Sequence, residues 1–430
     1  MDWSEKDLEY NWHPYTQHKG LKELPVIVKG KGEFLWDTNG KRYIDGIASW
    51  WVNPFGHSNS VLAEAIYNQL NTLEHVLFGG FTHTKAIELS ERLLGLLPSN
   101  QKKVFYSDNG STAVEIAIKA ALQFFYNKGL KKTKIIAFEN AFHGDTFGAM
   151  AASGISFFTE AFKNSLIEVE RIPVPTKGNE ERCIKQFETL VKTDGFACFI
   201  FEPLVLGAAG MQMYDAEPLN QLITIAKQNQ VFTIADEVMT GFGKTGKTFA
   251  SEYLSQQPDM ICLSKALTGG TIPMAVTSFS EEVFQGFYDD DINKALFHGH
   301  TFTANPTGCA AALATINLLL TDEMQGHIKR VHQSHLKFLK QLEGKKVANI
   351  RVLGVILAFE LEVDGEHDYY GNLRNRLYQF FIEQGVILRP VGNTIYVLPP
   401  YTISDESLNI IYQKILESID KFGERLKNKF

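Results

Sequence analysis

The chain has 430 residues, of which 44% are hydrophobic and 21% are charged, and this composition excludes a disordered chain, a coiled coil and a collagen-like repeat. With 42 Lys and Arg against 49 Asp and Glu, the formal net charge is −7, so the chain as a whole does not attract nucleic acid or an anionic membrane. The length predicts two or three domains around more than one hydrophobic core.

The sequence carries no sign of export or of a membrane anchor. The first ten residues are rich in charge and lack the apolar core of a signal peptide, and no uncharged apolar run reaches the ~18 residues of a membrane helix. Cys183, Cys198, Cys262 and Cys309 are far apart, which favours free buried thiols over disulfides or a zinc site. We therefore expect a cytoplasmic protein without a structural metal.

Strands and helices are expected to alternate from about residue 103 to 280. Apolar residues at helical spacing predict helices at 112–126 and 218–228. Short apolar runs predict strands at 103–107, 134–139, 196–202, 231–236 and 260–264. Buried parallel strands covered by helices produce this pattern, so we expect an α/β fold with a mostly parallel sheet.

The two ends of the chain have a different texture. Near the N-terminus, strands are expected at 33–37 and 42–45 across a turn at 38–40. After residue 310 we expect helices at 310–320, 327–342 and 405–422, and strands at 350–360 and 394–398. We predict a large domain over 51–310, a smaller α+β domain over 311–430, and an N-terminal segment, 1–50, that packs with the smaller domain.

One glycine-rich segment, 241–248, matches both G-x-G-x-x-G and the P-loop pattern G-x-x-x-x-G-K-[ST]. A P-loop should begin a substantial helix, but barely ten residues separate this segment from Pro258. The acid expected about 20 residues after a dinucleotide motif would be Asp259, which stands at the start of a strand instead of its end. We interpret 241–248 as a glycine-rich active-site loop and keep nucleotide binding as an alternative.

The chemistry-bearing residues are distributed over three strand ends. Asp236 ends one predicted strand, Lys265 follows the next one 29 residues later, and Asn109-Gly110-Ser111 opens a helix. Taken alone, each has an ordinary explanation: Asp236 can cap a turn, Lys265 can be a surface lysine, and Gly110-Ser111 is a common start of a helix. Together, at one edge of a parallel sheet, they match pyridoxal phosphate, whose aldehyde condenses with a lysine, whose ring nitrogen pairs with a carboxylate and whose phosphate needs an anion cradle.

At this point the sequence resembles the class III aminotransferases, which are similar to fold-type I pyridoxal phosphate enzymes. The matching segments are 107–115, 143–146, 234–238 with 240–243, 263–267 and 298–302. The resemblance implies that Lys265 and Asp236 are catalytic, with Lys265 binding the cofactor aldehyde and Asp236 its pyridine nitrogen. It also implies that the Gly110 and Ser111 amides bind the phosphate and that Phe142 stacks on the ring.

The resemblance extends to the assembly. It implies that His300 and Thr301 reach the phosphate of the neighbouring subunit's cofactor, so that the active unit is a homodimer with shared active sites.

Within this family, the sequence is most similar to a branch of biotin biosynthesis. That branch aminates 8-amino-7-oxononanoate to 7,8-diaminononanoate, usually with S-adenosylmethionine as amino donor. The resemblance rests on residues 12–17, 49–51, 143–150, 388–390 and 396–401. It implies that the substrate contacts an apolar aromatic wall, a polar aromatic lid and one cation. The substrate-binding residues that it implies are Tyr15, Trp50, Phe142, Lys265, Gly299 and Arg389.

Three positions depart from the pattern of that branch. Phe142 stands where tyrosine is common, Lys244 where the class often has arginine, and His300 where a proline is found. These departures leave the amino donor open between S-adenosylmethionine and lysine. An ω-aminotransferase acting on ornithine or 4-aminobutyrate, and a P-loop ATPase, remain alternatives.

Overall fold

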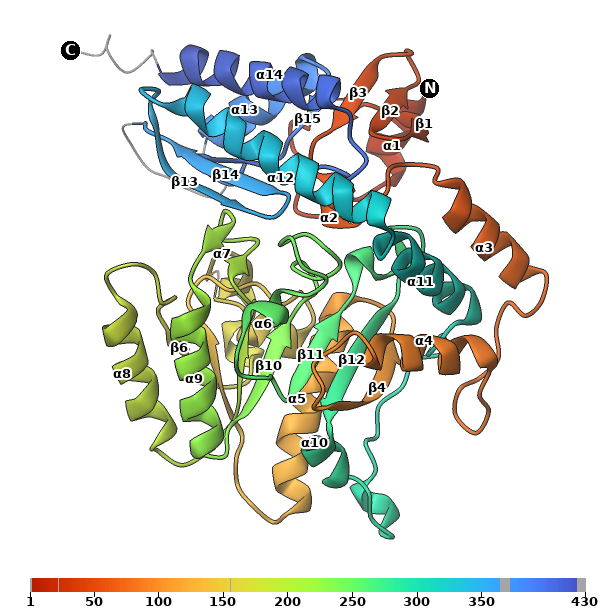
Figure 1. Ribbon diagram of the computed structural model, residues 1–430, viewed down its shortest axis with the longest axis vertical. Helices are drawn as coiled ribbons and strands as arrows, with labels where there is room; N and C mark the ends of the chain where they lie inside the picture. The colour runs from red at the N-terminus through yellow and green to blue at the C-terminus, as the bar shows by residue number, and fades with distance from the viewer. Residues whose placement is uncertain (1, 22, 155, 364–371, 424–430) are drawn as a thin grey trace.

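A seven-stranded sheet forms the centre of the larger part of the molecule in the computed structural model, which describes residues 2–21, 23–154, 156–363 and 372–423 (Figure 1). The strand order is β4-β12-β11-β10-β7-β5-β6. The strands are β4 (Gln101–Ser107), β5 (Lys134–Phe138), β6 (Val169–Ile172), β7 (Phe196–Phe201), β10 (Phe232–Asp236), β11 (Met260–Leu263) and β12 (Ala275–Ser280). Because only β12 is antiparallel to its neighbours, the other six strands run in one direction.

Both faces of this sheet are covered by helices, as the apolar strands predict. Alternate strand residues such as Ile234 and Cys262 pack with α5 (Gly110–Asn127). Their neighbours Ala235 and Ile261 belong to the core on the opposite face, which includes α8 (Glu180–Val191) and α9 (Ala216–Gln228). The five predicted strands and two predicted helices of this region are confirmed, whereas β6, β12 and α8 were not predicted.

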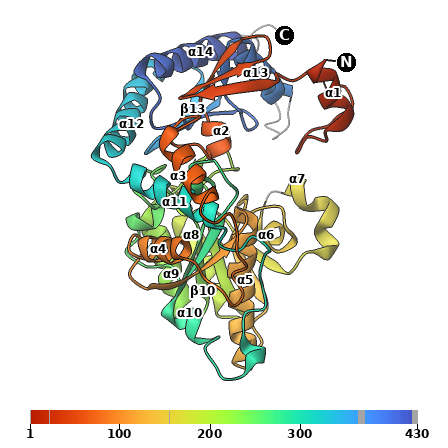
Figure 2. The same cartoon turned by 90° about the vertical axis from the view of Figure 1, so that its right-hand side faces the viewer.

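The smaller part combines the two ends of the chain (Figures 1 and 2). One sheet has the order β13-β14-β16 and the other β1-β2-β3-β15. Their strands are β1 (Ile27–Lys31), β2 (Phe34–Asp37), β3 (Arg42–Asp45), β13 (Val347–Leu353), β14 (Ile356–Leu361), β15 (Val386–Ile387) and β16 (Thr394–Val397). Helices α12 (Asp322–Leu342), α13 (Asn372–Glu383) and α14 (Asp405–Gly423) pack beside them, and α1 (Trp3–Tyr10) stands at the outer edge.

The prediction of a single strand at 350–360 is wrong. The chain reverses at Gly354, so that β13 and β14 form an antiparallel pair. Gly354 has a φ of 56°, and a Cβ there would lie 2.3 Å from the Lys244 carbonyl oxygen, so the turn requires glycine. The strand pair predicted at 33–37 and 42–45 is confirmed as β2 and β3.

A long helix connects the two parts. Helix α11 (Pro306–Leu319) starts four residues before the predicted 310, because Asn305 caps it and Pro306 occupies its first position. It packs against α3 (Ser60–Leu70) and α4 (Thr84–Leu94). The domain boundary predicted at 310/311 therefore falls inside α11.

The four cysteines are free and buried, as predicted. Among the helices in the described ranges, none combines the length and the apolar character needed to cross a membrane.

Candidate active site

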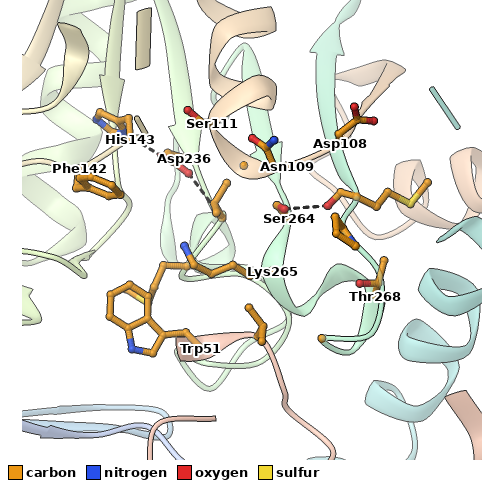
Figure 3. A pocket seen from close by; sticks show the side chains of 18 of the residues that line it. Trp51, Asp108, Asn109, Ser111, Phe142, His143, Asp236, Ser264, Lys265 and Thr268 are labelled. Carbon is orange, nitrogen blue, oxygen red and sulfur yellow. Dashed lines mark hydrogen bonds and ion pairs between the residues drawn. The ribbon is translucent and has the colours of Figure 1, made fainter. Parts of the chain in front are cut away.

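A cavity of about 510 Å³ lies beyond the carboxyl ends of β4, β10 and β11 (Figure 3). Its lining brings together Gly110, Ser111, Asp236 and Lys265, which come from three separate segments of the chain. Trp51, from the short helical turn α2 (Ala48–Trp51), lines the side that faces Lys265. The strand ends meet because β4, β10 and β11 point the same way, although the antiparallel β12 separates β4 from β11.

Asp236 is held from two sides. One carboxylate oxygen, Oδ2, lies 2.7 Å from His143 Nδ1, and the other, Oδ1, accepts a hydrogen bond from the Val238 amide at 3.0 Å. Both side chains are buried. His143 Nε2 is also buried and has no hydrogen-bond partner among the described residues. His143 was predicted only as part of a segment that matches the family, whereas the structure shows that it fixes the orientation of Asp236.

Lys265 follows β11 in a backbone conformation that places its amine in the cavity. Its φ is 48°, and Nζ lies 5.3 Å from the centre of the Trp51 ring. Burial lowers the pKa of the Lys265 amine, and the charges of Asp236 and Glu202 oppose this shift. A buried amine with a lowered pKa is more often neutral, which is the form that attacks an aldehyde or accepts a proton.

The start of α5 forms an anion cradle. Asn109 caps the helix and accepts a hydrogen bond from the Thr112 amide, whereas the earlier Gly110 and Ser111 amides have no intrahelical acceptor. A Cβ at Gly110 would lie 2.6 Å from a methyl carbon of Val238, so only glycine lets the backbone lie this close to the cavity wall. Free amides and the positive end of an 18-residue helix suit a phosphate.

Glu202 is a site residue that the sequence analysis missed. It follows β7 and lines the cavity, and its carboxylate accepts hydrogen bonds from the Phe142 amide at 3.0 Å and the Gly207 amide at 2.9 Å. Burial raises the pKa of Glu202 to about 7; Asp236 adds to the shift, and His143 opposes it. The signal was available, because Glu202 stands after a buried parallel strand just as Asp236 ends one.

The loop 241–248 does not have the structure of a P-loop. It forms turns, followed by the four-residue 3-10 helix η2 (Ala250–Tyr253) instead of a long helix. Lys244 is buried and donates to the Gly241 carbonyl oxygen at 3.1 Å. Burial and the nearby charge of Lys265 lower the pKa of Lys244 to about 7. The Lys244 amine is thus bound to a carbonyl oxygen of its own loop, whereas the lysine of a P-loop reaches toward phosphates.

A row of aromatic rings leads away from the cavity to a cation. The centres of neighbouring rings in this row are 5.4–6.1 Å apart. At the far end of the row, the guanidinium of Arg389 lies 4.5 Å from the centre of the Trp50 ring. The Tyr15 hydroxyl also donates to Asp145. We call this row the substrate wall, and its members are Phe142, Phe158, Tyr15, Trp50 and Arg389. Four of them were predicted from the sequence, whereas Phe158 and Asp145, the partner of Tyr15, were not.

The remaining predicted residues lie elsewhere. Gly299, His300 and Thr301 are outside the cavity of their own chain, and Gly299 and Thr301 are exposed. His300 Nδ1 lies 3.5 Å from Asp108, which itself lines the cavity. Of the three, His300 is thus in contact with a residue of the cavity wall.

Known proteins are similar to this chain over nearly its whole length. The family model described as "Aminotransferase class-III" matches residues 15–419. A curated Synechococcus elongatus protein named adenosylmethionine-8-amino-7-oxononanoate aminotransferase is 41% identical, over 95% of this chain and 98% of that protein. A Staphylococcus aureus protein of the same name is 36% identical, over 96% of this chain and 97% of that protein.

Solved structures of aminotransferases are also similar to this chain. The structure bearing that name from Methanocaldococcus jannaschii is similar with a TM-score of 0.92 and 34% identity, and the match covers 97% of this chain and 98% of the other. An omega transaminase from Pseudomonas jessenii, in complex with PMP, is similar with a TM-score of 0.93 and 27% identity over the full length of both chains.

Proposed function

The chain belongs to the class III aminotransferases, and we propose that it transfers an amino group from S-adenosylmethionine to 8-amino-7-oxononanoate, giving 7,8-diaminononanoate in biotin biosynthesis. Two kinds of support meet here. The relatives that are 36–41% identical over nearly their whole length carry the name of this reaction. The observation that carries the proposal is the substrate wall, a row of rings that runs from the cavity to the guanidinium of Arg389.

The cofactor of the family is pyridoxal phosphate, and the residues of the cavity fit each of its functional groups. Lys265 would hold the aldehyde, Asp236 the ring nitrogen, and the Gly110 and Ser111 amides the phosphate. When bound, the cofactor supplies a protonated ring that accepts the electron pair left behind when a proton leaves the reacting carbon.

The protein's own groups divide the remaining work. Lys265 is suited to accept and return that proton, because burial lowers its pKa toward the range of a useful base. Asp236 stays oriented through His143 and the Val238 amide, so its carboxylate meets a ring nitrogen without first reorganising. The Trp51 ring lies beside the Lys265 amine and helps to exclude water from it.

The substrate wall fits a long chain that ends in a carboxylate. Arg389 offers the two parallel N–H donors that a carboxylate prefers, and the Trp50 ring beneath it can cover the alkyl chain. Tyr15 adds a polar edge that its bond to Asp145 keeps in place. Phe142 begins the wall at the cavity, where its ring can stack on the cofactor.

We also propose a homodimer in which His300 and Thr301 of one subunit reach the phosphate site of the other, and we keep Gly299 beside them as a substrate contact. These residues lie outside their own cavity, and the large apolar side chains Phe297 and Phe302 beside them are exposed. Sedimentation analysis tests the dimer. We assign the protein to the cytoplasm, because four free buried thiols suit a reducing compartment.

A donor screen tests the proposed reaction. Purified protein loaded with pyridoxal phosphate is supplied with 8-amino-7-oxononanoate and either S-adenosylmethionine, lysine, ornithine or 4-aminobutyrate, and diaminononanoate is measured. We expect product with S-adenosylmethionine. Product with lysine alone would move the donor assignment to lysine, and no product with any donor would overturn the ketone substrate.

A further inference from the structure

The turn that carries Trp50 and Trp51 has an unusual backbone. Four consecutive residues that are not glycine, Ala48 to Trp51, have φ values of 47°, 46°, 66° and 72°. They form one turn of left-handed helix, closed by hydrogen bonds from the Trp51 amide to Ile47 and from the Val52 amide to Ala48. L-amino acids other than glycine adopt this conformation only at a cost in free energy. The surrounding structure must therefore hold it.

The turn sends its two tryptophans to different parts of the site. Trp50 is 38% exposed and lies in the substrate wall, between Tyr15 and Arg389. Trp51 is 6% exposed and lies against the Lys265 amine. In a right-handed turn the same two side chains would leave the backbone in other directions, so the handedness decides whether both rings reach their places.

A buried polar network holds the turn. Asp45 is fully buried at the end of β3, and its Oδ2 accepts a hydrogen bond from Ser49 Oγ at 2.7 Å. The same oxygen lies 3.0 Å from His57 Nε2, while Oδ1 accepts from the Ile47 amide at 3.2 Å. Asn53 Nδ2 lies 3.0 Å from His57 Nδ1, which places the ring proton on the Nε2 that faces Asp45. One carboxylate therefore fixes residues before, within and after the turn.

Serine, histidine and aspartate together also occur in nucleophilic sites, but the order of contacts here is different. Ser49 and His57 both approach the same oxygen of Asp45, and Ser49 Oγ is 3.5 Å from His57 Nε2. A histidine whose Nε2–H faces the carboxylate cannot take the serine proton at that nitrogen. None of the three residues lines the cavity. The arrangement fits a clamp on the backbone.

We propose that Asp45, Ser49 and His57 are positioning residues for transamination, and that they act by holding residues 48–51 left-handed. Through Trp50 they set the affinity for the ketone substrate, and through Trp51 they set the surroundings of the Lys265 amine. The first of these effects rests on the proposed function, since it assigns the ketone to the substrate wall.

Two substitutions at Ser49 separate the clamp from a direct role of the hydroxyl. Ser49→Ala removes the hydroxyl and keeps a side chain that resists positive φ. Ser49→Gly also removes the hydroxyl, but glycine adopts positive φ readily. The matched control is Ser58→Ala, because Ser58 has a φ of 54° and donates to the Gly30 carbonyl oxygen at 2.8 Å, outside the network.

We expect Ser49→Ala to raise KM for 8-amino-7-oxononanoate on the order of tenfold and to lower kcat by less. Ser49→Gly should recover most of the lost affinity, and Ser58→Ala should match the wild type. The near-ultraviolet circular dichroism of the cofactor-free protein gives a second readout. Its tryptophan bands should change in Ser49→Ala and return toward the wild type in Ser49→Gly.

The proposal is overturned if the alanine and glycine variants lose affinity equally, or if neither differs from the wild type in both readouts. If Ser49→Ala does not fold, Ser49→Gly decides alone: a KM within about threefold of the wild type supports the clamp, and a tenfold rise overturns it. Wild-type protein that does not turn over this ketone would contradict the proposed function, and the dichroism of the cofactor-free variants would still test the clamp.

Discussion

The cofactor side of the cavity and the substrate wall are built in different ways. The cofactor side is made of Gly110, His143, Asp236 and Lys265; His143 and Asp236 are buried and fixed by hydrogen bonds, and Gly110 and Lys265 are half-buried. The substrate wall holds together through ring contacts and is partly exposed. Structures of the same fold carry different names, an oxononanoate aminotransferase and an omega transaminase, at TM-scores of 0.92 and 0.93. We therefore expect the chemistry that such enzymes share to depend on the cofactor side, and the choice of substrate to depend on the wall.

The largest effect is expected on the cofactor side. Lys265→Ala should lower kcat by at least roughly 10²–10⁴-fold, because it removes the amine that moves the proton. It should also abolish the absorbance of protein-linked cofactor. Lys192→Ala, at the exposed residue that follows α8, is the control and should have no effect. Full activity of Lys265→Ala would remove the distinction between the two sides.

The next effect concerns stability and pH. Glu202 has a pKa raised by burial from 4.5 to about 7, so between these values the folded protein binds more protons than the unfolded chain. Its contribution to the free energy of unfolding is therefore fully present below pH 4.5 and is lost as the pH rises to about 7. The loss is on the order of 3 kcal/mol. Urea unfolding of the cofactor-free protein at several pH values measures this loss. In Glu202→Gln the loss should be absent, and parallel curves for the two proteins would contradict the assignment.

A smaller effect is expected at the far end of the wall. Arg389→Ala should raise KM for the ketone by roughly 10–100-fold with little change in kcat, because a charge-assisted pair with the substrate carboxylate is lost. The KM of Arg389→Lys should lie between those of the wild type and Arg389→Ala, because lysine keeps the charge but lacks the two parallel N–H donors of arginine. Arg42, which lies 4.4 Å from the Phe34 ring away from the wall, supplies the control Arg42→Ala. A drop in kcat with unchanged KM would assign Arg389 to the chemistry instead.

The smallest effect is expected where the two sides meet. Phe142→Tyr adds a hydroxyl at the start of the wall and keeps the ring, so it should change KM for the ketone by roughly twofold to tenfold. The position of the Phe142 backbone should stay the same, because its amide is bound to Glu202. Steady-state kinetics with each amino donor shows whether the hydroxyl acts on the ketone or on the donor. A loss of bound cofactor would place Phe142 on the cofactor side.

The sequence predicted the cofactor side more completely than the wall, and the reason is physical. The ends of parallel strands lie at one edge of a sheet, so Asp236 and Lys265 could be brought together without coordinates. The same rule would have found Glu202 after β7. The partner of Asp236 was harder to predict, because His143 follows β5 by five residues in an irregular loop.

Four of the five residues of the wall were predicted one by one and Phe158 was not, and the arrangement of the wall could not be predicted. Tyr15, Trp50 and Arg389 come from distant segments, and no periodicity relates them. The left-handed turn at 48–51 depends on His57 and Asp45, which local propensity does not take into account. The division of 350–360 into two strands likewise depends on a tertiary contact of Gly354 with the loop at 244–246.

The parallel pairing of β3 with β15 joins Ile44 and Asp45 to Val386 and Ile387. During synthesis, β3 has no partner on that side until β15 has left the ribosome. Contacts so distant in sequence carry a large loop-closure cost and form late in folding. A nascent chain can therefore assemble the sheet around Asp236 and Lys265 first, while β3, which leads into the turn of Trp50, still lacks its partner β15.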